Sequence, residues 1–217
     1  LLHEVAKDKE IVYVPCHRSH FDYLLLGYVT YLEGLQQPHI AAGINLNMPI
    51  VGAILRRGGA FFLRRSFKGN RLYAAVFDAY MQQVLSRGYS MEYFIEGGRS
   101  RTGRLLQHKG GMLMMTVNAY VTNPQRPIVF VPFYFGYEKL IEGADFISEL
   151  GGAEKQKESL GGLFRSIRSL RDQFGKVAVN VGQPIELEPL LDAMRPDWRE
   201  HVAVSYTHLT LPTSPKV

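Results

Sequence analysis

Short runs of apolar residues alternate with helical patterns along the chain. Runs of four or five such residues, bounded by turn residues, are typical of buried strands. The first run is followed by Pro15 and the fourth by Pro132, so we expect these two strands to end there. The runs that predict strands are residues 11–14, 60–63, 91–95, 128–131 and 177–181.

The segments between these runs carry helix signals. Ser19-x-x-Asp22 stands directly before an apolar run, as in a capping box that begins a helix. Asn70 precedes apolar residues at three- and four-residue spacing that continue to Leu85, which predicts a second capped helix. A similar apolar stripe predicts a third helix over residues 163–174.

Strands that alternate with helices predict an α/β fold with a mostly parallel central sheet flanked by helices. In such sheets the ligand crevice lies beyond the carboxyl ends of the strands. The polar segments of this chain follow predicted strands, so we expect them to meet at that edge. The 217 residues, 46% of them hydrophobic and 21% charged, fit one globular domain.

Cysteine content and hydropathy exclude several classes of protein. Cys16 is the only cysteine, which excludes a disulfide scaffold and a cysteine-based zinc site. No apolar run approaches the roughly 18 residues that a transmembrane helix needs. The chain opens on Leu1 rather than Met, and we expect it to be part of a longer protein. Residues 205–217, rich in Thr, Pro and Ser, are expected to be a non-native or disordered tail.

Charge is unevenly distributed. The net charge is +5. Two long stretches, residues 34–77 and 97–137, contain no acidic residue, and together they hold nine of the 16 arginines. Such clustering indicates an anionic partner. Charge alone leaves open a phosphorylated small molecule, an acidic protein, anionic lipid or nucleic acid.

His17 and Asp22 are the first candidate for chemistry. Five residues of helix would place them about 140° apart, so they cannot share a helix face. If His17 lies in the loop after the first strand, Asp22 in the first helical turn can fold back to it. An Asp that accepts the Nδ1 proton leaves Nε2 free as a general base. The alternative is that Asp22 only completes a capping box with Ser19 and that His17 is a polar loop residue.

Arg64 and Arg65 directly follow the second predicted strand. Arginine binds phosphate through paired, charge-assisted hydrogen bonds. A lone arginine pair is more often a solvated strand end, but Lys68 and Arg71 extend this cluster and favour anion binding.

Residues 94–104 form a glycine-rich segment after the third predicted strand. Gly98-x4-Gly103 has the spacing of a phosphate-binding P-loop, but Arg104 and Leu105 stand where that motif requires Lys and Ser or Thr. A nucleotide hydrolase is therefore excluded. What is left is either an exposed basic turn or an anion-binding loop, in which Glu96 could orient an arginine or accept a substrate hydroxyl.

Four segments together resemble the conserved blocks of the glycerolipid acyltransferase superfamily. The residues within and around these segments resemble those of the bacterial PlsB-type glycerol-3-phosphate 1-acyltransferases in particular. The blocks are H-x4-D, G-x-x-F-[IL]-x-R, F-x-E-G-x-R-S-R and V-P-x4-Y-E. They match residues 17–22, 59–65, 94–101 and 131–138, in the same order. Arg104 stands where many relatives have Lys. The resemblance implies a glycerol-3-phosphate acyltransferase-like fold, with residues 1–204 as the catalytic domain.

The resemblance also implies roles. His17 would be the general base and Asp22 its orienting partner. The reaction would transfer an acyl group from acyl-CoA or acyl-carrier-protein to the 1-hydroxyl of glycerol 3-phosphate, giving lysophosphatidate in the first step of phospholipid synthesis, with no cofactor and no metal. Pro132 would lie on the acyl-donor side. The residues implied in glycerol 3-phosphate binding are Arg64, Arg65, Glu96, Gly97, Arg99, Ser100 and Arg101.

The resemblance further implies a peripheral enzyme at the membrane surface, on the cytoplasmic face of the bacterial inner membrane. Two alternatives stay open. One is an acyltransferase of the same family with dihydroxyacetone phosphate or lysophosphatidate as acceptor. The other is a non-catalytic basic module that binds anionic lipid or nucleic acid. We expect no nucleic-acid partner, because the aromatic residues near the arginines lie in apolar runs rather than among basic residues.

Overall fold

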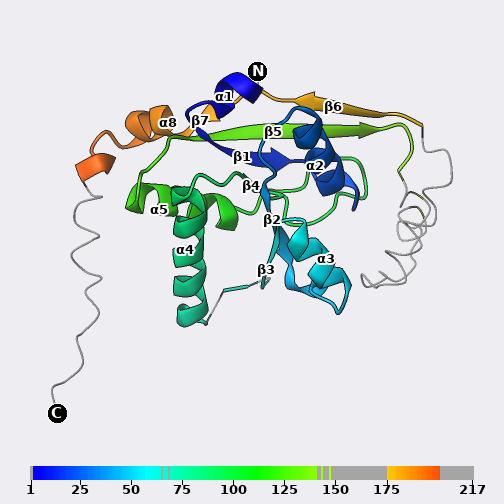
Figure 1. Cartoon of the computed structure of the whole chain (residues 1–217), viewed down its shortest axis with the longest axis horizontal. Helices are drawn as coiled ribbons and strands as arrows, with labels where there is room; N and C mark the ends of the chain where they lie inside the picture. The colour runs from blue at the N-terminus through cyan, green and yellow to red at the C-terminus, as the bar shows by residue number, and fades with distance from the viewer. Residues whose placement is uncertain are drawn as a thin grey trace, which may run out of the picture.

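The computed structural model describes residues 2–64, 66–67, 69–140, 143, 147 and 175–200. Its centre is a seven-stranded sheet in the order β3-β2-β4-β1-β5-β6, with β7 also paired to β5 (Figure 1). The strands are β1 (Glu10–Pro15), β2 (His39–Gly43), β3 (Ala60–Leu63), β4 (Met91–Glu92), β5 (Ile128–Tyr137), β6 (Val177–Val181) and β7 (Ile185–Glu186). The helices are α1 (Leu2–Ala6), α2 (Asp22–Leu32), the 3-10 helix η1 (Ile44–Leu46), α3 (Val51–Arg57), α4 (Arg71–Ser86), α5 (Gly111–Thr122) and α8 (Leu187–Met194).

The sheet is mostly parallel, as predicted. β1 runs parallel to β4 and β5, and β2 runs parallel to β3 and β4. Only β6 and β7, which pair with β5, are antiparallel among the described strands. The loops that follow β1 and β4 therefore leave the sheet at the same edge and from neighbouring strands.

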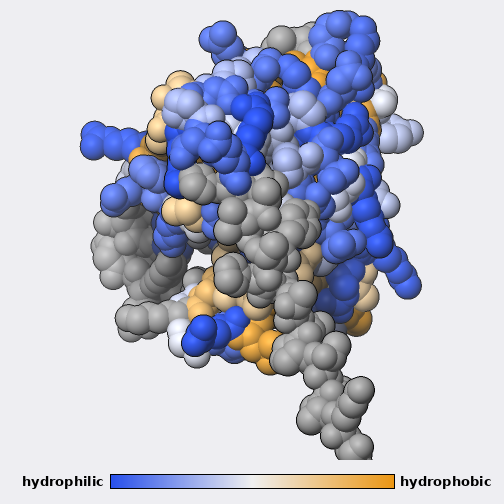
Figure 2. Space-filling view, turned by 90° about the vertical axis from the view of Figure 1, so that its left-hand side faces the viewer, coloured by the Kyte–Doolittle hydropathy of each residue, from blue (hydrophilic) through white to orange (hydrophobic). Residues whose placement is uncertain are grey.

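Apolar side chains cover both faces of the sheet. Along β1, Ile11 and Tyr13 face the layer that contains α1 and α2, while Val12 faces the layer that contains α4, α5 and α8. Leu26 of α2 is completely buried against the first face, which stabilises the fold by about 1.5–3 kcal/mol. The side of the molecule at the left of Figure 1, where α8, α5 and α4 lie, is mostly hydrophilic in its coloured residues, with apolar residues gathered toward its lower end (Figure 2). The mostly parallel sheet with helices packed on both faces confirms the α/β fold class.

Two predicted strand ends are wrong. β5 does not stop at Pro132 but continues to Tyr137, because the Pro132 carbonyl accepts a hydrogen bond from the Gly182 backbone at 2.8 Å and the residues beyond pair with β6. β4 is shorter than residues 91–95 and is assigned only to Met91–Glu92. The chain turns soon afterwards, where the Gly97 N–H donates to the Phe94 carbonyl at 2.9 Å.

Of the two helix starts predicted within the described residues, one is confirmed and the other is displaced by a few residues. Asn70 caps α4 as expected, since its side chain accepts a hydrogen bond from the Tyr73 backbone at 3.0 Å. α2 begins at Asp22 rather than at Ser19, and the residue before it, Phe21, makes no side-chain cap. The sequence patterns predicted none of α1, β2, η1, α3, α5, β7 and α8. The helix expected over residues 163–174 and the tail at residues 205–217 lie outside the described residues. Within the described ranges, no helix has the length and hydropathy to cross a membrane.

Candidate active site

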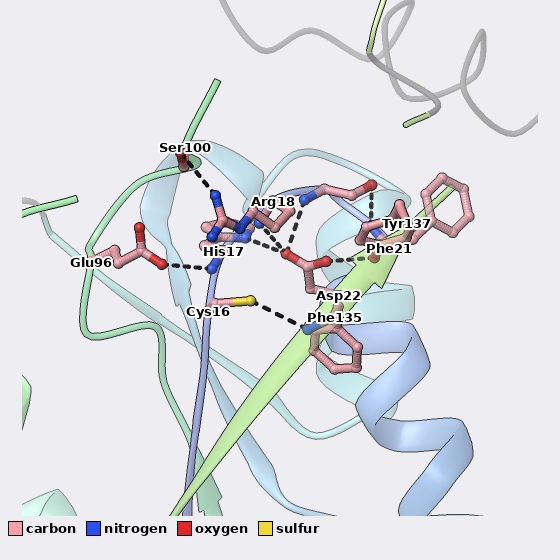
Figure 3. A network of polar contacts seen from close by, with 10 residues as sticks. Cys16, His17, Arg18, Phe21, Asp22, Glu96, Ser100, Phe135 and Tyr137 are labelled. Carbon is pink, nitrogen blue, oxygen red and sulfur yellow. Dashed lines mark hydrogen bonds and ion pairs between the residues drawn. The ribbon is translucent and has the colours of Figure 1, made fainter. Parts of the chain in front are cut away.

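Three neighbouring strands deliver polar side chains to one end of the sheet. His17 follows β1, Glu96 follows β4 on one side of β1, and Tyr137 ends β5 on the other side. In Figure 3, Glu96 lies to one side of His17, and Tyr137 lies beyond Asp22 on the other. The carboxyl edge of the sheet therefore carries the candidate site, where the topology of an α/β fold places ligands.

His17 and Asp22 are paired, as the sequence predicted. The His17 Nδ1 lies 3.0 Å from Oδ2 of Asp22, whose side chain is completely buried, while the His17 side chain is 15% exposed. The same Oδ2 accepts hydrogen bonds from the backbone of Arg18 at 2.5 Å and of Ser19 at 2.9 Å. Asp22 thus makes the backbone contact with Ser19 and also orients His17. Because a carboxylate only accepts, the hydrogen bond assigns the proton to Nδ1 and leaves Nε2 as the basic atom.

The His17 ring is fixed on both sides. Its imidazole stacks on Phe94, with ring centroids 3.9 Å apart and planes inclined by 23°. The His17 backbone N–H donates to Oε1 of Glu96 at 2.9 Å. These contacts hold the imidazole in one orientation before any substrate binds.

Glu96 shapes the loop that follows β4. It is 3% exposed, its Oε1 accepts from His17, and its Oε2 accepts from the Leu106 backbone at 2.8 Å. Gly97, the next residue, has φ of +61°, a conformation that favours glycine. The two carboxylate oxygens of Glu96 therefore accept hydrogen bonds from two backbone N–H groups. One belongs to His17, after β1, and the other to Leu106, in the later part of the loop.

Ser100 fastens this loop onto the His17 segment. It is completely buried, and its backbone N–H donates to the His17 carbonyl at 2.8 Å. Its hydroxyl accepts from Nη1 of Arg18 at 3.3 Å and donates to the Arg104 carbonyl. Arg99 and Arg101 flank it, are half-buried, and each interact with other groups of the protein. The backbone of this loop, between Arg99 and Arg101, therefore lies against the His17 segment.

Arg18 is a site residue that the sequence analysis missed. It is only 5% exposed, and its guanidinium lies 5.6 Å from the centroid of the Tyr134 ring. Among the described residues, the Arg18 Nε has no hydrogen-bond partner, and no carboxylate forms an ion pair with the Arg18 guanidinium. A buried charge is costly unless an opposite charge compensates it. Its position directly after His17 was the available signal.

The second predicted arginine cluster is farther away. Arg64 is exposed at the end of β3, where its guanidinium lies 4.8 Å from the centroid of the Tyr73 ring. β3 is separated from β1 by β2 and β4, a distance of about 14 Å at ordinary strand spacing. The structure therefore places Arg64 at the same edge of the sheet but not beside His17. Arg65 and Lys68 lie outside the described residues.

A pocket of about 560 Å³ opens beside Glu96, at the end of β1 and along the middle of β5. Burial raises the pKa of the Cys16 thiol, which lines this pocket, and this disfavours a nucleophilic thiolate. Most of the lining is apolar, and Pro132 is part of it. The principal lining residues are Val14, Cys16, Leu105, Leu106, Pro132 and Tyr134.

Glu92 is a second buried acid that the sequence did not reveal. Its side chain on β4 is completely buried, and neither carboxyl oxygen has a hydrogen-bond partner among the described residues. Burial, reinforced by the negative charge of nearby Asp22, raises the pKa of Glu92 well above its ordinary value. Burial therefore favours the neutral, protonated form of Glu92 over the carboxylate.

Among the described residues, no group of three His, Cys, Asp or Glu side chains could hold a metal ion. The absence of a metal and of a cofactor from the reaction stays a prediction.

Comparison with known proteins gives two family matches. The family described as Acyltransferase matches residues 2–136, which include the His17–Asp22 pair, the Glu96 loop and most of β5. The family described as Glycerol-3-phosphate acyltransferase C-terminal region matches residues 146–216.

Similar full-length proteins are bacterial. A glycerol-3-phosphate acyltransferase from Pseudomonas paraeruginosa (strain PA7) is 58% identical over 197 residues, which are 91% of this chain and 24% of that protein. The glycerol-3-phosphate acyltransferase of Pseudomonas fluorescens (strain SBW25) is 56% identical over 196 residues, 90% of this chain and 23% of that protein. This chain thus spans about a quarter of the length of the curated relatives it matches.

A solved structure, the 1-acyl-sn-glycerophosphate acyltransferase PlsC from Thermotoga maritima, is similar with a TM-score of 0.46 and 18% identity. The similarity covers 94% of this chain and 70% of that one.

Proposed function

The chain belongs to the acyltransferase family, and from this premise we propose that it carries the catalytic site of a glycerol-3-phosphate 1-O-acyltransferase. The observation that carries the proposal is the His17–Asp22 pair, in which a buried carboxylate leaves Nε2 of a partly exposed imidazole free to act as a base. The choice of glycerol 3-phosphate as acceptor is supported by the second family match and by the names of the relatives.

In the proposed reaction, Nε2 of His17 removes the proton of the 1-hydroxyl of glycerol 3-phosphate. The hydroxyl oxygen attacks the carbonyl carbon of an acyl thioester, and a tetrahedral intermediate forms. Its collapse breaks the carbon–sulfur bond, and the departing sulfur takes the proton from the His17 imidazolium. The products are lysophosphatidate and the free thiol of CoA or of acyl-carrier-protein. Asp22 keeps Nδ1 protonated and stabilises the transient imidazolium.

Acceptor binding is proposed for the arginines. Arg99 and Arg101 lie in the loop that docks on His17, and they supply the charge that a phosphate needs. Arg64 lies at the end of β3, farther along the same edge, and we propose that Arg64 and its neighbour in the sequence, Arg65, extend this site. We propose that Glu96, Gly97 and Ser100 serve acceptor binding through the shape of the loop, because the side chains of Glu96 and Ser100 already contact the protein.

The acyl group is proposed to enter the pocket lined by Pro132. Its apolar lining suits a hydrocarbon chain. No cofactor is invoked. Because the product is a lipid and the arginine-rich stretches would attract anionic headgroups, we also propose that the protein works at the membrane surface, on the cytoplasmic face of the bacterial inner membrane.

The test is the release of free thiol from palmitoyl-CoA, measured in detergent or lipid with each acceptor in turn. We expect release to require glycerol 3-phosphate and to be much slower with dihydroxyacetone phosphate or lysophosphatidate. Faster release with either of these would reassign the acceptor within the family. Release that ignores the acceptor would indicate a thioesterase, and no release above background would favour a non-catalytic lipid-binding module.

A further inference from the structure

We propose that Tyr137 is a positioning residue for the His17–Asp22 pair, acting through a hydrogen bond from its phenol to the Asp22 carboxylate. The proposal rests on the proposed function, in which His17 is the base. Tyr137 belongs to the fourth conserved block, but nothing in the sequence assigned it a role.

The contact is direct. The Tyr137 hydroxyl donates to Oδ1 of Asp22 at 2.5 Å, and Figure 3 shows the phenol approaching the carboxylate from the side opposite His17. The two oxygens of Asp22 therefore have different partners. Oδ2 binds the His17 ring and two backbone N–H groups, while Oδ1 receives the Tyr137 hydroxyl.

Burial makes this contact important. The Asp22 side chain has no exposed surface, so water cannot replace a lost donor without a rearrangement. A buried carboxylate oxygen that loses its hydrogen bond keeps the full cost of its desolvation. Tyr137 thus completes the hydrogen bonding of Asp22 and fixes the rotation of its carboxylate plane.

The position of Tyr137 is itself rigid. It is the last residue of β5, and it pairs with Val177 of β6. The next residue, Glu138, exchanges two hydrogen bonds with Lys176: its N–H donates to the Lys176 carbonyl, and its carboxylate accepts from the Lys176 N–H. The phenol therefore ties the first turn of α2 to the β5–β6 pair, which is possible only because β5 continues past Pro132.

The hydrogen bond also changes the basicity of His17. A donor on Oδ1 withdraws negative charge from the carboxylate, which then stabilises the imidazolium less strongly. Removing the hydroxyl should concentrate charge on Asp22 and make His17 more basic. The other ionisable groups that face Asp22 are Glu92 from β4, Cys16 at the end of β1, and His17 itself. The pKa of Glu92 is raised by burial, and the Arg18 guanidinium contacts Cys16 and Ser100.

The experiment is the substitution Tyr137→Phe, which removes one hydroxyl oxygen and keeps the ring. The pKa of His17 is measured by NMR titration of its ring protons, assigned with His17→Gln. We expect the pKa of His17 to rise by about half a unit to one unit, in line with the loss of one charge-assisted hydrogen bond. This readout needs no substrate, so it remains informative if the proposed reaction is wrong.

Kinetics supply the second readout. We expect kcat to fall about threefold to tenfold at neutral pH while the KM for glycerol 3-phosphate is unchanged, and the acid limb of the pH–rate profile to move to higher pH. Tyr31→Phe is the matched control, because Tyr31 is 72% exposed at the far end of α2. In an Asp22→Asn background, Tyr137→Phe should leave the pKa of His17 unmoved, since the two residues act as one unit.

Two results would overturn the proposal. One is a pKa of His17 and a pH–rate profile that are the same in Tyr137→Phe and in the unsubstituted protein. The other is a raised KM for glycerol 3-phosphate with kcat unchanged, which would make Tyr137 a substrate contact. Far-ultraviolet circular dichroism and thermal unfolding of Tyr137→Phe identify a folding defect. If Tyr137→Phe fails to fold, a fluorotyrosine at position 137 replaces it, because its more acidic hydroxyl is a stronger donor to Asp22 and should lower the pKa of His17; an unchanged pKa would then overturn the proposal.

Discussion

The backbone N–H of His17 donates to Oε1 of Glu96, 2.9 Å away and 79 residues later in the chain. His17 is thus held in place by Glu96, which follows the neighbouring strand β4 and whose second oxygen accepts from the Leu106 backbone. Two segments that lie far apart in the sequence form a single structural unit around this carboxylate.

Glu96→Gln should lower the rate more than it lowers acceptor affinity. The amide can accept from one backbone N–H, but its NH2 group faces the other N–H and cannot bond it. We expect kcat to fall at least tenfold, the KM for glycerol 3-phosphate to change less than threefold, and stability to fall by about 1–3 kcal/mol. Steady-state kinetics and urea unfolding test this. A large rise in KM at unchanged kcat would instead show that Glu96 contacts the acceptor.

The sequence predicted the contact between His17 and Asp22 better than it predicted the loops around them. The His17–Asp22 pair could be found because the five-residue spacing and the strand before it leave few other geometries. The contacts of Glu96, Ser100 and Arg18 could not, because each depends on how a long glycine-containing loop returns to the sheet. Local sequence patterns do not determine where such a loop contacts the sheet again.

Strand ends were the least predictable part of the fold. Pro132 reads as a strand terminator, yet β5 continues past it because a neighbouring backbone, Gly182, bonds its carbonyl. That compensation comes from a segment 50 residues away. The same extension places Tyr137 beside Asp22, so the error in strand length also hid this contact.

Glu92 should make stability depend on pH. Its pKa in the folded state is raised above the ordinary value of 4.5, so above that pH the unfolded chain loses the Glu92 proton while the folded protein keeps it. The folded state then binds more protons, and its stability falls as pH rises, by about 1.4 kcal/mol per pH unit, until the folded-state pKa is reached. Below both pKa values this contribution is constant.

Glu92→Gln mimics the neutral acid and should remove that slope. We expect the variant to gain stability over the unsubstituted protein as the pH rises from about 4.5 to 8, as measured by urea unfolding at each pH. Glu4→Gln, at an exposed carboxyl on α1, is the control. A stability difference that does not change with pH would mean that Glu92 is ionised in the folded protein.

Val181→Trp should narrow the pocket beside the site. Val181 lines it from β6, and a strand position accommodates an aromatic side chain. If the acyl chain occupies this pocket, the preference for palmitoyl-CoA over octanoyl-CoA should fall at least tenfold, while the KM for glycerol 3-phosphate stays the same. Leu72→Trp, exposed on α4, is the control. An unchanged chain-length preference would place the acyl chain elsewhere.

We propose that His17 is the base of a glycerol 3-phosphate-dependent acyl transfer. The most direct measurement is thiol release from palmitoyl-CoA by His17→Ala, beside glycerol 3-phosphate binding measured by calorimetry, with the exposed His3→Ala as control. We expect the rate of thiol release to fall about 10²–10⁴-fold in His17→Ala, while glycerol 3-phosphate binding is largely retained. His3→Ala should keep full activity. Acyl transfer that survives in His17→Ala would contradict the proposal.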